Sequence, residues 1–132
     1  MGIDGSRRIL IVDDEADVTE TLSAILARHD YEVRTAATAE LAIEAIATWQ
    51  PDLAIVDVSL PRMNGIELAV VIRDTHPQCR LVLFSGQHTT QSLLEEAAKK
   101  GRLFEILAKP VHPMFMLDYV SSRFAGRPKK TA

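Results

Sequence analysis

Five polar side chains stand at the ends of four short apolar runs, and their types could together support metal-dependent chemistry. In chain order they are Asp13 and Asp14, Asp57, Ser85, and Lys109. Carboxylates that are brought close together repel one another unless a cation lies between them, and oxygen ligands favour a hard ion such as Mg²⁺. The set therefore predicts an acidic magnesium pocket with Asp57 as its central residue.

The four apolar runs have the character of buried β-strands. Short runs bounded by turn residues suit strands that are covered on both faces of a parallel sheet. Ligands bind such sheets at the carboxyl ends of the strands. Each of the five polar residues stands at that end of its run, so we expect all five at one edge of the sheet.

Helical periodicity fills the segments between the predicted strands. The predicted order is strand 8–12, helix 16–29, strand 32–35, helix 38–49 with Thr38 as its N-cap, a strand ending at Asp57, helix 66–75, strand 81–84, helix 92–100, strand 104–108 and helix 113–124. Strands that alternate with helices imply right-handed crossovers and an α/β fold, a three-layer α/β/α sandwich with a doubly wound five-stranded parallel sheet. Periodicity alone leaves the strand order open.

Two helices carry apolar faces that their spacing assigns. In helix 38–49 the predicted buried residues are Leu41, Ala42, Ala45, Ile46 and Trp49, and in helix 113–124 they are Pro113, Leu117, Val120 and Phe124. Phe115 and Tyr119 then project from the opposite side of the last helix. Exposed aromatic rings mark interaction surfaces, although one ring could instead fold back over helix 92–100. We expect a surface for a protein partner or a homodimer on helix 92–100, strand 104–108 and helix 113–124.

Length and composition indicate one globular domain. The chain has 132 residues, of which 25% are charged and 47% hydrophobic, enough for a single core. The net charge of −3 and the pI near 5.8 argue against direct nucleic-acid binding. One cysteine, Cys79, fits a reducing cytoplasm, and no apolar stretch approaches the roughly 18 residues of a membrane span. We therefore expect a cytoplasmic protein that does not engage membranes.

The expected domain spans residues 7–124. Residues 1–6 and 125–132 are predicted to be flexible tails, the second of them basic. No output domain is expected after residue 125, so the protein would act through a partner.

The ordered motifs resemble a response-regulator receiver domain of two-component signalling. The resemblance extends from Arg7 to Phe124 and rests on Asp13-Asp14, Asp57, Pro61 with Gly65, Ser85, and Lys109-Pro110. It implies the flavodoxin-like strand order 2-1-3-4-5. It also implies phosphorylation of an aspartate by a histidine kinase or phosphotransfer protein.

The resemblance assigns a role to each polar residue. Asp57 would accept the phosphoryl group, since a carboxylate can attack phosphorus and form an acyl phosphate. Mg²⁺ would be held directly by Asp14, through water by Asp13, and by Asp57 and the backbone carbonyl of Ser59. Lys109 would pair with a phosphoryl oxygen, and Ser85 would donate its hydroxyl to another. The Lys109-Pro110 bond is typically cis in this family. Taken singly, these residues also fit loop acids, helix-end charges and a solvated lysine.

One departure from the family pattern bears on activation. Receivers commonly place Tyr or Phe three residues before the lysine, where this chain has Ile106, so the usual aromatic switch is absent. Phe104 lies on the same side of the strand but nearer its start.

Three function classes follow from these residues. The first is a phosphorylation-dependent switch that catalyses only its own phosphorylation and dephosphorylation. The second is an interaction module that keeps the fold and works without phosphate, an alternative that Ile106 leaves open. The third is an aspartyl-phosphate phosphotransferase or phosphatase resembling the haloacid dehalogenases, which carry a second aspartate where this chain has Ser59.

Overall fold

The computed structural model describes residues 7–86, 95, 98–99, 104–109 and 111–124. The elements within them are β1 (Arg8–Val12), α1 (Ala16–Ala27), β2 (Glu32–Ala36), α2 (Ala39–Ile46), β3 (Leu53–Asp57), α3 (Gly65–Thr75), β4 (Arg80–Ser85), β5 (Glu105–Ala108) and α5 (Pro113–Phe124). The strands form one parallel sheet in the order β2-β1-β3-β4-β5. The predicted doubly wound α/β fold and the strand order implied by the resemblance are both confirmed.

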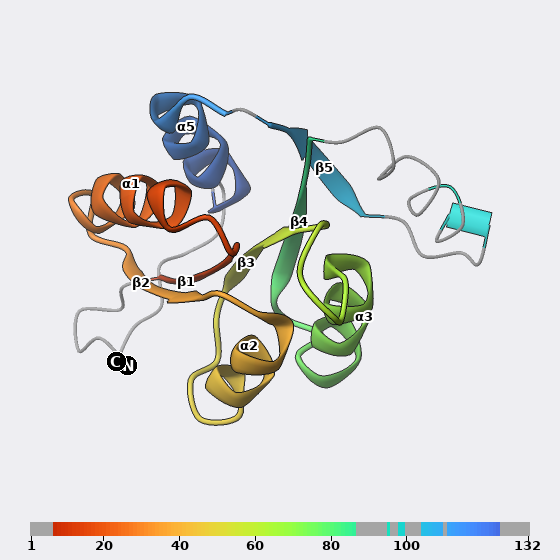
Figure 1. The fold of residues 1–132 in the computed structure, drawn as a ribbon. Helices are drawn as coiled ribbons and strands as arrows, with labels where there is room; N and C mark the ends of the chain where they lie inside the picture. The colour runs from red at the N-terminus through yellow and green to blue at the C-terminus, as the bar shows by residue number, and fades with distance from the viewer. Residues whose placement is uncertain (1–6, 87–94, 96–97, 100–103, 110, 125–132) are drawn as a thin grey trace.

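The sheet lies between two helical layers. Helices α1 and α5 cover one face, and α2 and α3 cover the other (Figure 1). Alternate residues of the central strands enter opposite cores: Ile9, Ile11 and Ile55 pack on the α1 and α5 side, whereas Leu10, Val12 and Val56 pack on the other side. Because the central strands are buried on both faces, their sequences are continuous apolar runs instead of alternating ones.

Strand boundaries agree with the prediction to within one residue, and larger differences occur at helix ends. Helix α1 stops at Ala27, two residues early, and Asp30 then takes a left-handed backbone conformation with φ of 70°. Helix α2 stops at Ile46, and the chain continues to Trp49 in hydrogen-bonded turns. In the predicted helix 92–100, Glu95, Ala98 and Lys99 are helical and the other positions lie outside the described residues, as do the tails 1–6 and 125–132.

Helix α2 corrects the predicted buried face. Leu41 is 50% exposed, whereas Ala39, Ala42 and Ile46 are buried and Ile43 is partly buried against the core. The buried residues follow steps of three and four, and Leu41 lies one position away from them. The predicted buried face of α2 was therefore wrong in including Leu41. Thr38 does cap the helix, because its Oγ1 accepts a hydrogen bond from the backbone N of Leu41 at 3.1 Å.

Helix α5 has the predicted bounds and most of the predicted stripe. Leu117, Val120 and Phe124 are buried with Met116, which was not predicted, whereas Pro113 is only half-buried. Phe115 is 55% exposed, as expected. Tyr119 is only partly exposed: its ring packs against the core, and its hydroxyl donates to Oε1 of Glu105 on β5 at 2.5 Å.

The amino end of the sheet is closed by paired charges around Trp49. The indole is buried, and the guanidinium groups of Arg8 and Arg34 lie 5.5 and 4.9 Å from its ring centroid. Its Nε1 donates to Oε2 of Glu32 at 3.2 Å, while Arg8 Nε pairs with Oε1 of the same carboxylate at 3.2 Å. Arg8, Glu32 and Trp49 therefore contact one another at this end of the sheet.

Within the described residues, no helix combines the length and the apolar character needed to cross a bilayer.

Candidate functional site

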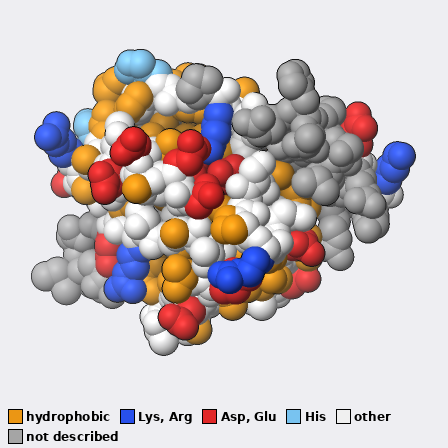
Figure 2. All heavy atoms as spheres, viewed as in Figure 1, with side chains coloured by type: hydrophobic (Ala, Val, Ile, Leu, Met, Phe, Trp, Pro, Cys, Tyr) orange, Lys and Arg blue, Asp and Glu red, His pale blue; other side chains and the backbone are white. Residues whose placement is uncertain are grey.

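The carboxyl ends of the strands bring the predicted acids together. Asp13 and Asp14 follow β1, and Asp57 ends β3, the neighbouring strand. Carboxylate oxygens of these three residues lie within 4.8 Å of one another. Figure 2 shows acidic side chains gathered at the centre of this face, with hydrophobic side chains over the adjoining α5 side.

The loop after Asp57 is fixed by its backbone. Asp57 Oδ1 accepts a hydrogen bond from the backbone N of Ser59 at 3.0 Å, and the backbone N of Gly65 donates to Val58 at 2.9 Å. A Cβ at Gly65 would fall 2.0 Å from the backbone oxygen of Asp57, so only glycine fits there. Helix α3 then begins with a capping box formed by Asn64 and Glu67. These contacts fix the position of Asp57.

Lys109 links the acids from the opposite side. It follows β5, and its backbone N extends the ladder by donating to the oxygen of Ser85 at 3.0 Å. Its Nζ lies 2.9 Å from Asp13 Oδ2, 2.9 Å from Glu15 Oε1 and 3.1 Å from Asp57 Oδ2. Burial by itself lowers the pKa of Lys109, but the bonds to the three carboxylates outweigh burial and raise this pKa above its ordinary value. The ammonium therefore stays charged at neutral pH.

Asp57 is buried, and its environment disfavours the charged form. Burial raises the pKa of this carboxyl, the Ser59 N–H and Lys109 oppose that rise, and the nearby charge of Asp13 adds to it. Asp13 is equally enclosed, and its Oδ2 has no hydrogen-bond partner among the described residues although Lys109 Nζ lies beside it. Two buried carboxylates thus share one ammonium.

This donor set fits a divalent cation. Three carboxylates offer oxygens from closely spaced positions, one of these oxygens is buried without a hydrogen bond, and Asp14 is exposed at the entrance. Carboxylate oxygens are the kind of hard ligand that Mg²⁺ prefers. Asp13, Asp14 and Asp57 therefore form a candidate magnesium site.

Comparison with known proteins identifies the family. The sequence model of the response regulator receiver domain matches residues 9–121. The chain belongs to this family. Its members are phosphoacceptor signalling domains of two-component systems, and the cluster of aspartates fits phosphorylation and magnesium binding.

Individual relatives agree with this assignment. The receiver is 32% identical over 113 residues to chemotaxis protein CheY of Thermotoga maritima, covering 85% of this chain and 92% of that one. It is 36% identical over 104 residues to nitrogen assimilation regulatory protein NtrX of Azorhizobium caulinodans, covering 77% of this chain and 22% of the relative. Against the first curated relatives that match, the chain thus spans about a fifth of their length.

Solved structures match over nearly the whole chain. A CheY-like receiver domain protein from Methanospirillum hungatei has a TM-score of 0.79 at 28% identity, covering 89% of this chain and 93% of that one. The receiver domain of NtrX from Brucella abortus has a TM-score of 0.74 at 31% identity, covering 91% and 99%. Both comparisons agree with the fold described above.

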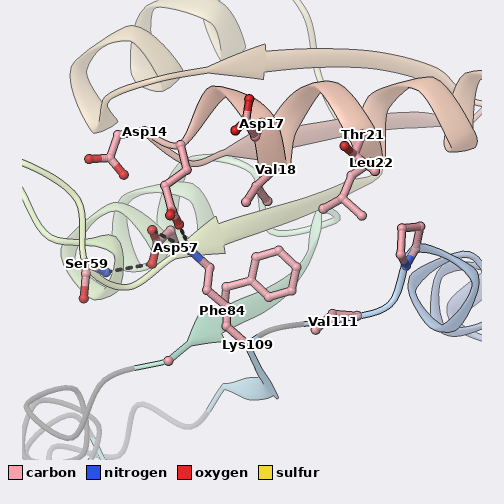
Figure 3. Close-up of a pocket in the computed structure, with 13 residues that line it drawn as sticks. Asp14, Asp17, Val18, Thr21, Leu22, Asp57, Ser59, Phe84, Lys109 and Val111 are labelled. Carbon is pink, nitrogen blue, oxygen red and sulfur yellow. Dashed lines mark hydrogen bonds and ion pairs between the residues drawn. The ribbon is translucent and has the colours of Figure 1, made fainter.

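A cavity of about 770 Å³ opens over the acidic cluster of this receiver. Asp14, Asp57, Ser59 and Lys109 line its polar end. The apolar lining comes from α1, β4 and the segment before α5, through Val18, Leu22, Phe84 and Val111. In Figure 3, Lys109 reaches toward Asp57 with the ring of Phe84 beside its stem. A phosphoryl group entering here would meet charge at one end and apolar surface at the other.

Some predicted features stand apart from the cluster or outside the described residues. Ser85 ends β4, one residue past the register partner of Asp57, and within the described chain no hydrogen bond joins its hydroxyl to Asp57 or Lys109. The Lys109-Pro110 bond cannot be placed because Pro110 lies outside the described residues. Ile106 is 46% exposed and pairs in register with Leu83.

Sequence reasoning missed the contact between Glu15 and Lys109. Glu15 directly follows the two aspartates, and no role was predicted for it from the sequence. The available signal was a third acid next to Asp13 and Asp14. Because β1 and β5 belong to the same parallel sheet, the residues that follow them lie at the same edge, where an acid can reach Lys109.

Proposed function

We propose that Asp57 accepts a phosphoryl group from a phosphohistidine of a partner kinase or phosphotransfer protein. A carboxylate oxygen of Asp57 attacks phosphorus, the new O–P bond forms, the N–P bond breaks, and the imidazole nitrogen keeps the electron pair. The observation that carries this proposal is the placement of Asp57, which is buried at the floor of the cavity and held by the Ser59 N–H and by Lys109 Nζ.

The surrounding residues would stabilise the transferred group. Asp13, Asp14, Asp57 and the backbone carbonyl of Ser59 would hold Mg²⁺, which supplies positive charge against the phosphoryl oxygens when bound. Lys109 would turn its ammonium to one phosphoryl oxygen and so neutralise charge that builds during transfer. The Ser85 hydroxyl would donate to another oxygen after a local shift of the end of β4.

The phosphorylated state would be recognised at a surface formed by β5 and α5 with the segment 92–100. Ile106 and Phe115 line a shallow groove with Val111 and His112, and both apolar side chains are exposed. Without an aromatic ring at position 106, phosphorylation would change this surface through shifts of loops and helices. The occupant would be a downstream protein or a second receiver in the cytoplasm, and no outside substrate would be turned over.

The exposure of Ile106 and Phe115 also supports a second candidate. Their exposed groove could serve an interaction module that works without phosphate.

Phosphorylation by acetyl phosphate tests the leading proposal. Wild-type protein should gain one phosphoryl group in Mg²⁺ and none in EDTA, and Asp57→Asn should gain none, as measured by intact-protein mass spectrometry. Asp74→Asn, which removes an exposed acid of α3, is the matched control and should behave as wild type. If wild-type protein stays unmodified in Mg²⁺, the phosphate-independent candidate replaces this one.

Sedimentation velocity with and without acetyl phosphate tests the proposed surface. Ile106→Ala and Phe115→Ala should weaken self-association and leave the extent of phosphorylation unchanged. Leu41→Ala removes a comparably exposed apolar side chain on α2 and should have no effect. If the wild-type protein is monomeric both with and without acetyl phosphate, the groove does not bind a second copy, and its occupant would be a different protein.

A further inference from the structure

Three carboxylates bind Lys109, and Glu15 differs from the other two in its exposure. The side chain of Asp13 is fully buried and that of Asp57 is 6% exposed, whereas that of Glu15 is 61% exposed. All three oxygens lie within 3.1 Å of Nζ. The contact with Glu15 is therefore as short as the buried ones, yet its carboxylate lies at the solvent boundary.

The backbone of Glu15 is fixed by hydrogen bonds, whereas its side chain does not cap the helix that it begins. Glu15 is the N-cap of α1, its backbone N donates to Asp13 Oδ1 at 2.9 Å, and its carbonyl accepts from Val18 and Thr19. Its side chain makes no capping hydrogen bond. Within the described chain, the carboxylate pairs with Lys109 Nζ, 2.9 Å from its Oε1.

An incoming phosphoryl group must compete for Lys109. An ammonium has three N–H donors, and three carboxylates already surround this one. Turning Lys109 away from Asp13 or Asp57 would leave a buried carboxylate without a cation, which is costly. Moving the Glu15 carboxylate into water costs little, because exposed ion pairs contribute only about 0.2–1 kcal/mol.

We propose that Glu15 is a positioning residue that holds Lys109 in the unphosphorylated protein and is displaced when a phosphoryl group arrives. This inference rests on the proposed phosphorylation of Asp57. Glu15 acts through Lys109 and slows phosphoryl acceptance by occupying the donor that the phosphoryl oxygen needs. Removing its charge frees that donor and raises the affinity of the site for tetrahedral anions.

The test compares Glu15→Gln, Glu15→Asp and Asp17→Asn. Glu15→Gln removes the charge with little change of shape, and Glu15→Asp keeps the charge but shortens the reach to Lys109. Asp17→Asn removes a charge from the same turn of α1, where the side chain points away from Lys109 in Figure 3. The control thus separates contact with Lys109 from a general loss of negative charge.

Two readouts are measured at saturating Mg²⁺: the rate of phosphorylation by acetyl phosphate and the affinity for beryllofluoride. If Glu15 had a purely structural role, the substitutions would lower the midpoint of urea denaturation and leave these two readouts unchanged. Glu15→Gln and Glu15→Asp should raise both readouts about three- to five-fold, the upper part of the range expected for one exposed ion pair. Asp17→Asn should change them less than two-fold.

The outcomes separate the two proposals. If wild-type protein is phosphorylated and Glu15→Gln matches Asp17→Asn in both readouts, the role of Glu15 is overturned and the proposed function stands. If Glu15→Asp matches wild type while Glu15→Gln does not, charge alone acts and the contact with Lys109 is overturned. If wild-type protein takes no phosphoryl group and binds no beryllofluoride, both proposals fail.

Discussion

The two ends of the sheet arrange charge in opposite ways. At the amino end Arg8 pairs with Glu32, and its backbone N donates to Asp52 Oδ2 at 2.8 Å. At the carboxyl end Asp13, Asp57 and Glu15 share the single ammonium of Lys109, and Asp14 lies beside them. Acidic and basic groups are paired at the amino end, whereas carboxylates outnumber the ammonium at the carboxyl end.

The pKa shifts follow this difference. Hydrogen bonding from Trp49, with help from Arg8, lowers the pKa of Glu32, whereas burial raises the pKa of Asp57. A lowered carboxyl pKa means that the folded state favours the charge, and a raised one means that it disfavours it. The charge of Glu32 at the amino end therefore stabilises the folded state, whereas the charge of Asp57 at the carboxyl end destabilises it.

The largest expected effect comes from the backbone beneath Asp57. Gly65→Ala would place a methyl group against the backbone of Asp57 and Val58, so the loop must move. We expect a loss of about 3 kcal/mol in urea denaturation, together with loss of phosphorylation. Gly86→Ala is the control, because its nearest contact is the Lys109 side chain at 3.0 Å, which can shift more easily. Equal losses in the two variants would contradict a rigid Asp57 loop.

Lys109→Met should reveal the cost of gathering acids at one edge. It leaves the buried carboxylates of Asp13 and Asp57 without a cation, and in EDTA we expect a loss of about 2 kcal/mol of unfolding free energy. Adding Asp57→Asn to Lys109→Met should recover part of that loss. Urea titrations that show no difference between Lys109→Met and wild type in EDTA would mean that water already screens these charges.

Asp57→Asn should stabilise the protein at neutral pH. Because the folded-state pKa of Asp57 lies above its ordinary value of 3.8, ionisation costs the folded state more than the unfolded one. In EDTA at pH 7 we expect a higher free energy of unfolding than for wild type. This gain should shrink as the pH falls through the folded-state pKa and vanish below 3.8. Mg²⁺ should narrow the difference by stabilising wild type. A gain that is constant from pH 7 to pH 3.5 would assign the effect to packing.

Glu32→Gln is the counterpart at the amino end and should show the opposite sign. The folded-state pKa of Glu32 lies below its ordinary value of 4.5, so its charge contributes stability above pH 4.5 that is lost as the pH falls through the folded-state pKa. The side chain is 37% exposed, and after screening we expect a loss of about 0.5 kcal/mol at pH 7. Thermal melts of Glu32→Gln and Asp57→Asn at the same pH values should therefore move in opposite directions.

Sequence reasoning anticipated the fold and the acidic cluster because both depend on local patterns. Apolar runs buried on two faces identified four of the strands, and in a parallel sheet their polar ends must meet at one edge. That argument predicts Asp13, Asp14, Asp57 and Lys109 at one edge of the sheet, and the structure brings them together there. The strand order needed the resemblance, because periodicity does not distinguish among doubly wound folds.

The misses depend on contacts between residues far apart in the chain. Tyr119 was assigned to solvent by helical spacing, but Glu105 on β5 supplies an acceptor for its hydroxyl. The bond between Glu15 and Lys109 joins residues 94 positions apart. The width of the buried face of α2 depends on how α2 sits on the sheet, so Leu41 could not be assigned from its spacing alone.

The location of Trp49 has a spectroscopic consequence. It is the only tryptophan in the sequence, and it is buried at the amino end of the sheet, where guanidinium groups flank the indole. Leu53 to Asp57 of β3 separate that end from the phosphoacceptor site by roughly 13 Å of strand. Intrinsic fluorescence should therefore respond to global unfolding of the receiver and remain almost silent when Mg²⁺ or a phosphoryl group binds at Asp57.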